Sequence, residues 1–293
     1  MMPMRLFVFG LGYTGLAFAR SMRGKAEWIG GTVRSPDKAA RLCEEGIETV
    51  VFDGKAPAPG IALALARTTH LLITISQGDA GDPVLAAHGG DILVAPALRW
   101  IGYLSTVGVY GDHGGAWIDE LTPPDPRMAR AVARIAAEKA WTELAERRDL
   151  PLGLFRLAGI YGPGRNPLVK LAEGRAHTIV KPGQVFNRIH VADIAATLGA
   201  AIAQPARRIY NVTDDEPAPP QDVVAYAARL MGVVPPPAVL FADADLSPLA
   251  RSFYEGNRRV SNRRIKDELG VILGYPTYRD GLEALWREGT WRG

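Results

Sequence analysis

The 293-residue chain carries 34 Lys plus Arg against 31 Asp plus Glu, a formal net charge of +3, and 47% of its residues are hydrophobic. This balance is ordinary for a globular protein and gives no reason to expect a nucleic-acid partner. The single cysteine, Cys43, excludes an intramolecular disulfide, and with five His it provides no metal-ligand cluster. No apolar run approaches the roughly 20 residues of a membrane span. We therefore expect a cytoplasmic protein with no metal and no membrane partner.

Short apolar runs alternate with helix-like segments through the first two thirds of the chain. The runs span 5–9, 28–33, 49–52, 70–75, 100–105 and 153–157, and the helix-like segments span 13–22, 36–45, 61–67, 83–88 and 129–148. Nearly continuous apolar runs are typical of parallel strands covered on both faces. Repeated strand–helix–strand units imply right-handed crossovers. The pattern predicts an α/β fold with a doubly wound parallel sheet.

A glycine-rich turn follows the first of these strands. Gly10, Gly12 and Gly15 form Gly-x-Gly-x-x-Gly directly before a helix, with Tyr13 and Thr14 inside the pattern. In this context Gly10 permits the turn, Gly12 lets the backbone approach a pyrophosphate, and Gly15 lets helix and strand pack closely. Phosphates would then bind at the helix N-terminus. The alternative is an ordinary turn, since glycines punctuate many loops.

The end of the second strand indicates which dinucleotide is bound. Arg34 and Ser35 stand where a carboxylate would bind the ribose 2′-hydroxyl of NAD, and the nearest acid, Asp37, lies beyond a proline. An Arg at this place accommodates a 2′-phosphate, so NADP is favoured while NAD stays open. Alternatively, Arg34 is a solvated surface charge. Asp53, after the third strand, either contacts the adenine region or caps a turn.

The regular alternation of apolar runs and helix-like segments ends after about residue 160, and prolines cluster further on, at 217–220 and 235–237. One further strand-like run, 208–212, can return to the sheet. We predict a dinucleotide-binding domain at 1–160 plus 186–213. A smaller, discontinuous C-terminal capping region is predicted at 161–185 plus 214–293.

The sequence resembles an atypical branch of the extended short-chain dehydrogenase/reductases, the NAD-dependent epimerase/dehydratase family. Besides the glycine turn, the resemblance rests on segments in the family's order, at 103–112, 155–164, 188–194, 210–212, 262–270 and 275–276. It implies a Rossmann fold, a bound NAD(P) and a small-molecule substrate, which could be similar to a nucleotide sugar. It also leaves a homodimer through the helix at 129–148 open. The glycine spacing differs from the Gly-x-x-Gly-x-x-Gly of extended members.

The long helix departs from the family in a way that matters for chemistry. Relatives carry Tyr-x-x-x-Lys, in which the Tyr is the acid/base and the Lys binds the ribose. Alignment on 137–138 puts Arg130 at the Tyr position and Arg134 at the Lys position. Arg134 can still donate to ribose hydroxyls, but Arg130 cannot exchange protons near neutral pH and could only contact substrate. Alignment on Lys139 instead supplies Ile135, which is not a phenol either.

The resemblance also implies other contacts. Thr106 matches the Ser or Thr whose hydroxyl binds a substrate oxygen, unless it satisfies the backbone at a strand end. Tyr110 and His113 are candidate acid/bases on the following loop, although Tyr110 could simply pack and His113 be exposed. Further candidates are Ser76, Ala158 and Gly159 for the cofactor, and Arg188, His190 and Arg258 for an anionic substrate. Arg188 and His190 could equally join the two regions, and Arg258 could belong to a solvated basic face.

Two functions are compatible with these observations. The first is an NADP(H)-binding oxidoreductase, epimerase or dehydratase with a non-standard acid/base, in which hydride passes between the nicotinamide and a carbon held near Thr106. The second is a non-catalytic sensor or scaffold that keeps the glycine turn and Arg134 but has lost the phenol. We favour the enzyme. The sequence does not identify the substrate.

Overall fold

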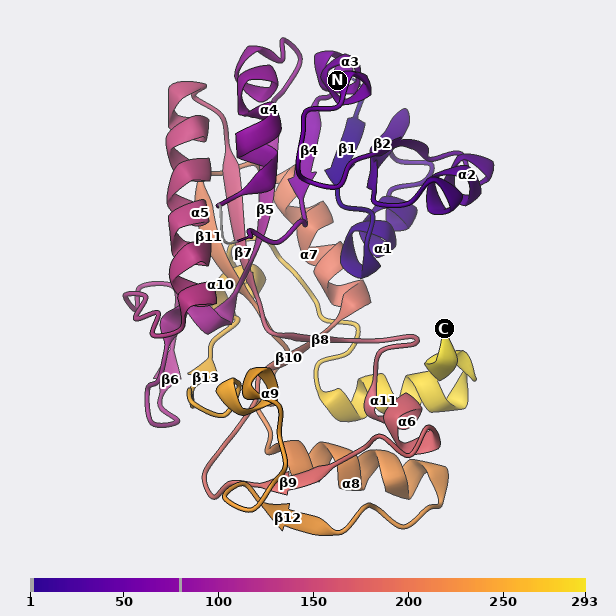
Figure 1. Ribbon diagram of the computed structural model, residues 1–293, viewed down its shortest axis with the longest axis vertical. Coiled ribbons are helices and arrows are strands. Elements are labelled where there is room, and N and C mark those ends of the chain that lie inside the picture. Colours follow the sequence, from indigo (N-terminus) through magenta and orange to yellow (C-terminus); the bar gives the residue numbers. More distant parts are fainter. Residues whose placement is uncertain (1–2, 79–80) are drawn as a thin grey trace. The chain divides into compact units, whose positions relative to one another are not determined.

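The computed structural model describes residues 3–78 and 81–293 and has a mixed α/β architecture (Figure 1). Its central sheet has seven strands in the order β11-β7-β5-β4-β1-β2-β3, and the pairs β3–β2, β2–β1, β1–β4 and β4–β5 are parallel. The strands are β1 (Arg5–Phe9), β2 (Trp28–Val33), β3 (Glu48–Val51), β4 (His70–Ile73), β5 (Trp100–Thr106), β7 (Leu152–Leu157) and β11 (Arg208–Val212). The predicted doubly wound fold is confirmed.

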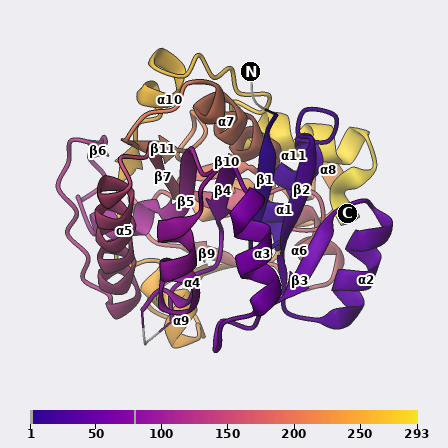
Figure 2. The ribbon, with the colours of Figure 1, turned by 90° about the horizontal axis from the view of Figure 1, so that it is seen from above.

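Helices follow the strands of this sheet, as a doubly wound fold requires. They are α1 (Tyr13–Ser21), α2 (Pro36–Glu44), α3 (Pro59–Arg67), α4 (Pro83–Val94), α5 (Ala129–Arg147) and α7 (Val191–Ala203). Helices α3, α4 and α5 cover one face of the sheet (Figure 2). Side chains of these helices and of β1, β4 and β5 form a large core there. Asp82 caps α4 by accepting from the amides of Val84 and Leu85, and it also accepts from the Trp141 indole at 2.9 Å. This one carboxylate therefore fixes α4 against α5.

The chain divides into two compact units. Unit one comprises the described residues up to Val109, with Pro126–Arg156 and Ala195–Tyr210, and unit two comprises Tyr110–Asp125, Leu157–Ile194 and Asn211–Gly293. Unit two contains the parallel strand pairs β6 (Trp117–Ile118) with β13 (Arg259–Val260), β8 (Gly159–Tyr161) with β10 (Arg188–His190), and β9 (Thr178–Val180) with β12 (Ala238–Leu240). Its helices are α6 (Pro167–Ala172), α8 (Pro220–Met231), α9 (Pro248–Ser252), α10 (Arg263–Asp267) and α11 (Tyr278–Arg287), and two 3₁₀ turns lie at η1 (Val107–Tyr110) and η2 (Thr290–Arg292).

Most predicted elements lie where the sequence placed them, with different ends. The helix predicted at 83–88 continues to Val94, because Gly89 and Gly90 lie inside it rather than ending it. The strand predicted at 70–75 ends at Ile73, since Thr74 turns its hydroxyl to the glycine loop. By packing, four segments assigned to the predicted dinucleotide-binding domain lie in unit two, at 110–125, 157–160, 186–194 and 211–213. The predicted functional boundaries of the two domains stay a prediction.

Across 3–78 and 81–293, no helix combines the length and apolar character that would carry it through a bilayer.

Candidate active site

The turn between β1 and α1 is held by hydrogen bonds from two neighbouring segments of the sheet. Gly10 has φ +95°, its amide donates to Thr32 Oγ1 at 2.8 Å, and its carbonyl accepts from Thr74 Oγ1 at 2.6 Å. A Cβ at Gly10 would lie only 2.6 Å from that Thr74 oxygen. Glycine is therefore required here both by the left-handed backbone and by the lack of space.

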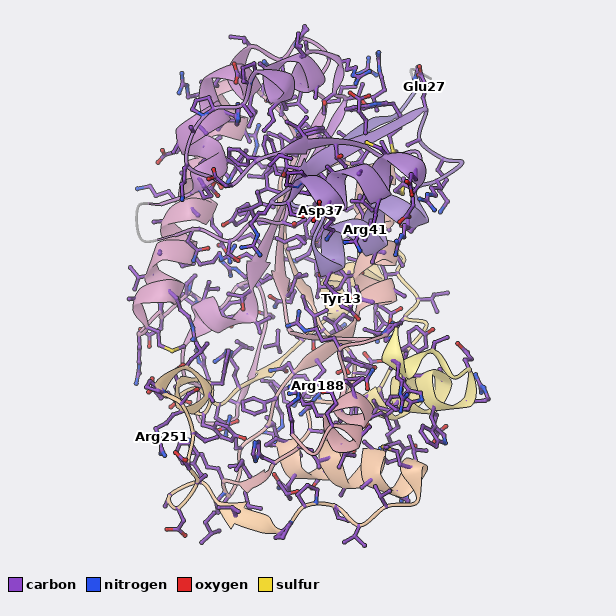
Figure 3. The ribbon with its side chains drawn as sticks, turned by 45° about the vertical axis from the view of Figure 1, so that its right-hand side comes forward. Tyr13, Glu27, Asp37, Arg41, Arg188 and Arg251 are labelled. Atoms are coloured by element: carbon purple, nitrogen blue, oxygen red, sulfur yellow. The ribbon has the colours of Figure 1, made fainter. Side chains whose placement is uncertain are left out.

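Gly12 and Gly15 have opposite surroundings. A Cβ at Gly15 would lie 2.3 Å from the Gly10 carbonyl oxygen, whereas a Cβ at Gly12 would meet no atom within 4 Å. Gly12 is the N-cap of α1, and no side chain caps this helix. The first turn of α1 contains half-buried Tyr13 (Figure 3) and buried Thr14, and it has no acidic residue. Gly15 thus permits close packing. Gly12 leaves room at an electropositive helix end, which fits a diphosphate.

Four cations gather where β2 ends and α2 begins. Arg34 is exposed directly after β2, and the Ser35 hydroxyl caps α2 by accepting from the Lys38 amide at 3.2 Å. Burial, followed by the positive charges of Arg41, Arg20 and Arg34, lowers the pKa of Lys38. A cation whose pKa is lowered by like charges is one that an additional anion would stabilise.

One of these cations, Arg20, is paired with an acidic group. Glu45 accepts from Arg20 at 2.8 and 3.0 Å, so that guanidinium is already paired. Asp37 is the acid in the first turn of α2, the helix that also carries Arg41 (Figure 3). Arg34 and Lys38 have no ion-pair partner among the described residues. These two side chains are therefore the best placed to contact a 2′-phosphate.

Two other cofactor candidates have simple local surroundings. Asp53 Oδ1 accepts from the Lys55 amide at 2.9 Å, so this carboxylate closes the turn that follows β3. Ser76 is exposed three residues after β4. Contacts of either residue with the adenine or ribose stay predictions.

Thr106 is the last residue of β5. Its hydroxyl accepts from the Gly108 amide at 3.1 Å and is half-buried. Because a hydroxyl that accepts one hydrogen bond still has a proton to donate, Thr106 can cap the 3₁₀ turn η1 and also hold a substrate oxygen. The predicted structural role is therefore present, and it leaves the substrate role open.

Arg134 on α5 is turned toward β5. Its Nη1 donates to Tyr103 Oη and to the Leu104 carbonyl, both at 3.0 Å, while its Nε is buried without a partner. Tyr103 is fully buried, and burial raises the pKa of its phenol to about 12. Arg134 is thus anchored at the place predicted for the ribose-binding Lys. It retains a buried donor that a ribose hydroxyl could satisfy.

The start of α5 is tied to the loop that follows β4. Gln77 Nε2 donates to the Arg130 carbonyl at 2.9 Å, and Gln77 Oε1 is buried without a partner. The Arg130 side chain is half-buried. A phenol is absent from this position, and proton transfer by Arg130 is excluded because guanidinium stays protonated.

The candidate acid/bases Tyr110 and His113 lie in unit two. Tyr110 is fully buried, and its hydroxyl donates to Asn211 Oδ1 at 2.8 Å. His113 Nε2 donates to the Tyr110 carbonyl at 3.0 Å. Tyr110 therefore packs in the interior, which is the structural alternative that the sequence left open for it. Catalytic roles for the pair stay predictions.

The remaining predicted contacts are also in unit two. The Ala158 amide donates to the Val212 carbonyl and the Gly159 amide to the Asn187 carbonyl, both at 3.0 Å. Arg258 donates to the Gly111 carbonyl, and burial lowers its pKa, so it does not belong to a solvated basic face. Its substrate contact stays a prediction.

His190 is buried between two tyrosines. Its Nδ1 accepts from the Ala192 amide at 3.2 Å, its Nε2 has no partner, and its ring lies 3.9 Å from that of Tyr275 and 5.2 Å from that of Tyr161. Burial lowers the pKa of His190 to about 4, so the ring is neutral near pH 7.

Several polar residues of these regions were not singled out from the sequence. They are Tyr103, Gln77, Glu138, Arg156 and Asp214. Tyr103 lies three residues before Thr106 in a strand that is buried up to Ser105, so no alternation of polar and apolar residues indicates its role. Only Arg156 carried a signal, being a charge inside a predicted buried strand, which requires a partner.

Comparison with known proteins agrees with this geometry. The model of the NAD-dependent epimerase/dehydratase family matches residues 97–213. A functionally unknown conserved protein from Silicibacter pomeroyi DSS is 52% identical, with a TM-score of 0.89 over 97% of this chain and 98% of that one. Residues 97–213 of this chain therefore carry an NAD-dependent epimerase/dehydratase domain.

Two other relatives have described activities. The chain is 28% identical over 207 residues to a 3-diazoavenalumate denitrifying reductase from a Streptomyces species, and the match covers 67% of this chain and 65% of the reductase. The solved UDP-glucuronic acid 4-epimerase from Bacillus cereus, in complex with UDP-glucuronic acid and NAD, is 16% identical with a TM-score of 0.77 over 97% and 98% of the two chains. At that identity the likeness concerns the fold.

Proposed function

We propose that this protein binds NADP(H) and catalyses hydride transfer to or from a small substrate, without the family's tyrosine acid/base. The uncapped helix end at Gly12 is the observation that carries the proposal, because no atom lies within 4 Å of a Cβ built there and free amides at a helix N-terminus favour a diphosphate. The cations Arg34 and Lys38 support NADP over NAD. That a relative is a reductase supports an enzyme.

Two residues of this chain would hold the cofactor and the substrate. Arg134 binds the nicotinamide ribose through its free Nε, and Thr106 donates its hydroxyl to a substrate oxygen. A bound nicotinamide supplies the hydride donor or acceptor. Since Arg130 cannot move a proton, the proton comes from water or from another group of the substrate site.

A titration with NADPH and NADH, followed by calorimetry, tests the cofactor assignment. We expect NADPH to bind at least tenfold more tightly than NADH, and Arg34→Asp to remove most of that preference. Arg147→Asp, a charge reversal at an exposed arginine near the end of α5, is the matched control and should bind NADPH like the wild type. Equal affinities for the two nucleotides in the wild type would overturn the NADP assignment.

A second function, a non-catalytic NADP(H) sensor, is favoured by one observation. The phenols closest in sequence to Thr106, Tyr103 and Tyr110, are both fully buried with bonded hydroxyls. A screen of NADPH oxidation with carbonyl compounds separates the two functions. Turnover that Thr106→Ala abolishes supports the enzyme. Activity that appears only in the double variant Arg130→Tyr with Arg134→Lys supports the sensor.

A further inference from the structure

Arg188 in unit two is a fixed cation with unused donors. Its Nη1 donates to the carbonyls of Phe186 and Ala218 at 2.9 and 3.1 Å, which sets the direction of the guanidinium. Burial lowers the pKa of Arg188. Among the described residues it forms no ion pair, and its Nε and Nη2 donate to no protein atom. A half-buried charge without a counter-ion is costly.

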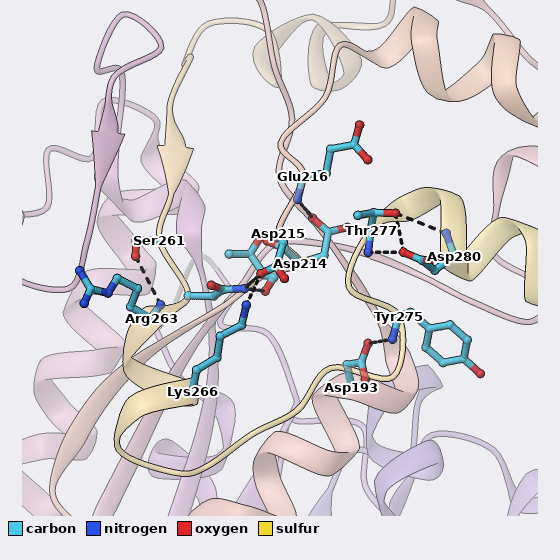
Figure 4. A network of polar contacts seen from close by, with 12 residues as sticks. Asp193, Asp214, Asp215, Glu216, Ser261, Arg263, Lys266, Tyr275, Thr277 and Asp280 are labelled. Atoms are coloured by element: carbon cyan, nitrogen blue, oxygen red, sulfur yellow. Dashed lines mark hydrogen bonds and ion pairs between the residues drawn. The ribbon is translucent and has the colours of Figure 1, made fainter.

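Asp214 is the acid facing Arg188, but it does not act as a full counter-ion. It is 1% exposed, and burial raises its pKa to about 8 against the lowering effect of Arg188. Its Oδ1 accepts from the Glu216 amide at 3.3 Å, while Oδ2 is buried without a partner (Figure 4). Near neutral pH this carboxyl is mostly protonated, so it leaves the charge of Arg188 largely uncompensated.

The other charged groups around Asp214 have partners of their own. Asp215 accepts from Lys266 at 2.5 Å, and Glu216 accepts from Arg279 at 2.8 Å. Tyr161 also faces Asp214 and Arg188, and its hydroxyl donates to the Thr277 carbonyl at 3.3 Å. Arg188 is therefore the charged group of this cluster that has no ion-pair partner among the described residues.

Two further features mark the same place as able to take a ligand. Tyr278 is 1% exposed, its ring centroid lies 5.9 Å from Arg188 Cζ, and its hydroxyl has no partner. Gly159, which is exposed, is paired with Arg188 in the β8–β10 register and has no side chain of its own to cover the guanidinium. Buried polar atoms without partners are rare and call for a bound group.

We propose that Arg188, Asp214 and Tyr278 form an oxyanion site that binds a carboxylate or phosphate group. The guanidinium offers two donors in the planar arrangement that such an anion accepts. Protonated Asp214 and the Tyr278 hydroxyl each donate one more hydrogen bond. Only the assignment of this anion to the substrate rests on the proposed function, since anion binding itself needs no dinucleotide.

Calorimetric titration of the whole protein with malonate and with inorganic phosphate, without dinucleotide, tests the site. We expect Arg188→Met to weaken binding of the preferred anion at least tenfold. Arg263→Met, which removes an exposed arginine of unit two, should leave it unchanged. Gly12→Val identifies any separate anion binding at the glycine turn. Tighter malonate binding indicates a carboxylate substrate, and tighter phosphate binding a phosphate ester.

The pH dependence supplies a second, independent signature. As pH rises from 6 to 9, wild-type affinity should fall at least tenfold, because deprotonated Asp214 repels the anion. Asp214→Asn should abolish this fall. If Arg188→Met does not fold, Arg188→Lys, which keeps the charge but loses the fork, should weaken binding severalfold. Wild-type affinity in a folded Arg188 variant, or an unchanged pH slope in Asp214→Asn, overturns the proposal, whatever the NADPH titration shows.

Discussion

Glu138 of α5 and Arg156 of β7 form a bidentate ion pair inside unit one, with nitrogen–oxygen distances of 3.1 and 2.7 Å. Their side chains are 6% and 3% exposed, and the Ser105 hydroxyl donates to the same carboxylate at 2.5 Å. This contact fixes α5 to β5 and β7 directly beside Thr106. The orientation of the helix that carries Arg134 therefore depends on a charge pair in the core.

Breaking this pair should be far more costly than breaking a surface pair. Arg156→Met leaves a buried carboxylate without its counter-ion, and we expect a loss of roughly 3–5 kcal/mol in the free energy of unfolding. Arg175→Met, which removes an exposed partner of Glu173, is the control and should cost about 1 kcal/mol or less. Urea denaturation measures both. Similar losses in the two variants would show that Arg156 is not the anchor.

The glycine turn allows a test in which folding and binding respond to different residues. Gly12→Val places its side chain in open space, so the protein should fold normally but lose at least a hundredfold in NADPH affinity. Gly15→Val forces a Cβ against the Gly10 carbonyl, so it should lower stability by about 3 kcal/mol, in the range of overpacking in a filled core. Thermal melts and NADPH titration separate the effects. Undiminished NADPH binding by folded Gly12→Val would remove the dinucleotide site.

Tyr103 should act through Arg134 rather than on substrate. Tyr103→Phe removes a hydrogen bond to the guanidinium, a loss of about 1 kcal/mol, so NADPH affinity should weaken roughly fivefold. Because the phenol is fully buried, the pH profile of any activity should not change. A lost limb of that profile in Tyr103→Phe would instead identify Tyr103 as the acid/base.

Stability in mild acid should depend on His190. Its pKa in the folded protein is about 4, below the ordinary 6.5, so between these values the unfolded chain binds a proton that the folded protein does not. The contribution of His190 to stability should therefore fall as pH drops from 6.5 to 4, by up to about 1.4 kcal/mol per unit. His190→Asn should flatten this slope. His177→Asn, at an exposed histidine, should not.

The contribution of His70 must be separated in that measurement. Burial lowers its pKa to about 4 as well, so it produces a slope of the same sign. Denaturation of the single and double variants at pH 4.5, 5.5 and 6.5 distinguishes the two histidines. Asp214, whose pKa is raised to about 8, produces a slope of the opposite sign in every one of these proteins. A slope that is the same in the wild type, both single variants and the double variant would contradict the assignment for both histidines.

How far the sequence could predict the site depended on how local each feature is. The strand–Gly10–Gly12–Gly15–helix order is local, because backbone geometry at a tight turn selects glycine, and the structure places all three as expected. Arg34 and Ser35 follow β2 for the same reason. The contact between Arg134 and Tyr103 joins residues 31 positions apart, so no spacing could indicate it.

From the sequence by itself, hydrophobic periodicity and turn chemistry determined the order of elements in the α/β sheet and the glycine turn between β1 and α1. The resemblance to the family placed Arg130 where relatives carry a tyrosine. Only the tertiary structure decided which polar side chains are buried and which of their atoms lack partners. Asp214, Arg188 and Tyr278 come from three separate segments, and of these only Arg188 was a candidate from the sequence. Their protonation and unused hydrogen bonds follow from burial and from neighbours distant in the chain, which are properties of the packed protein.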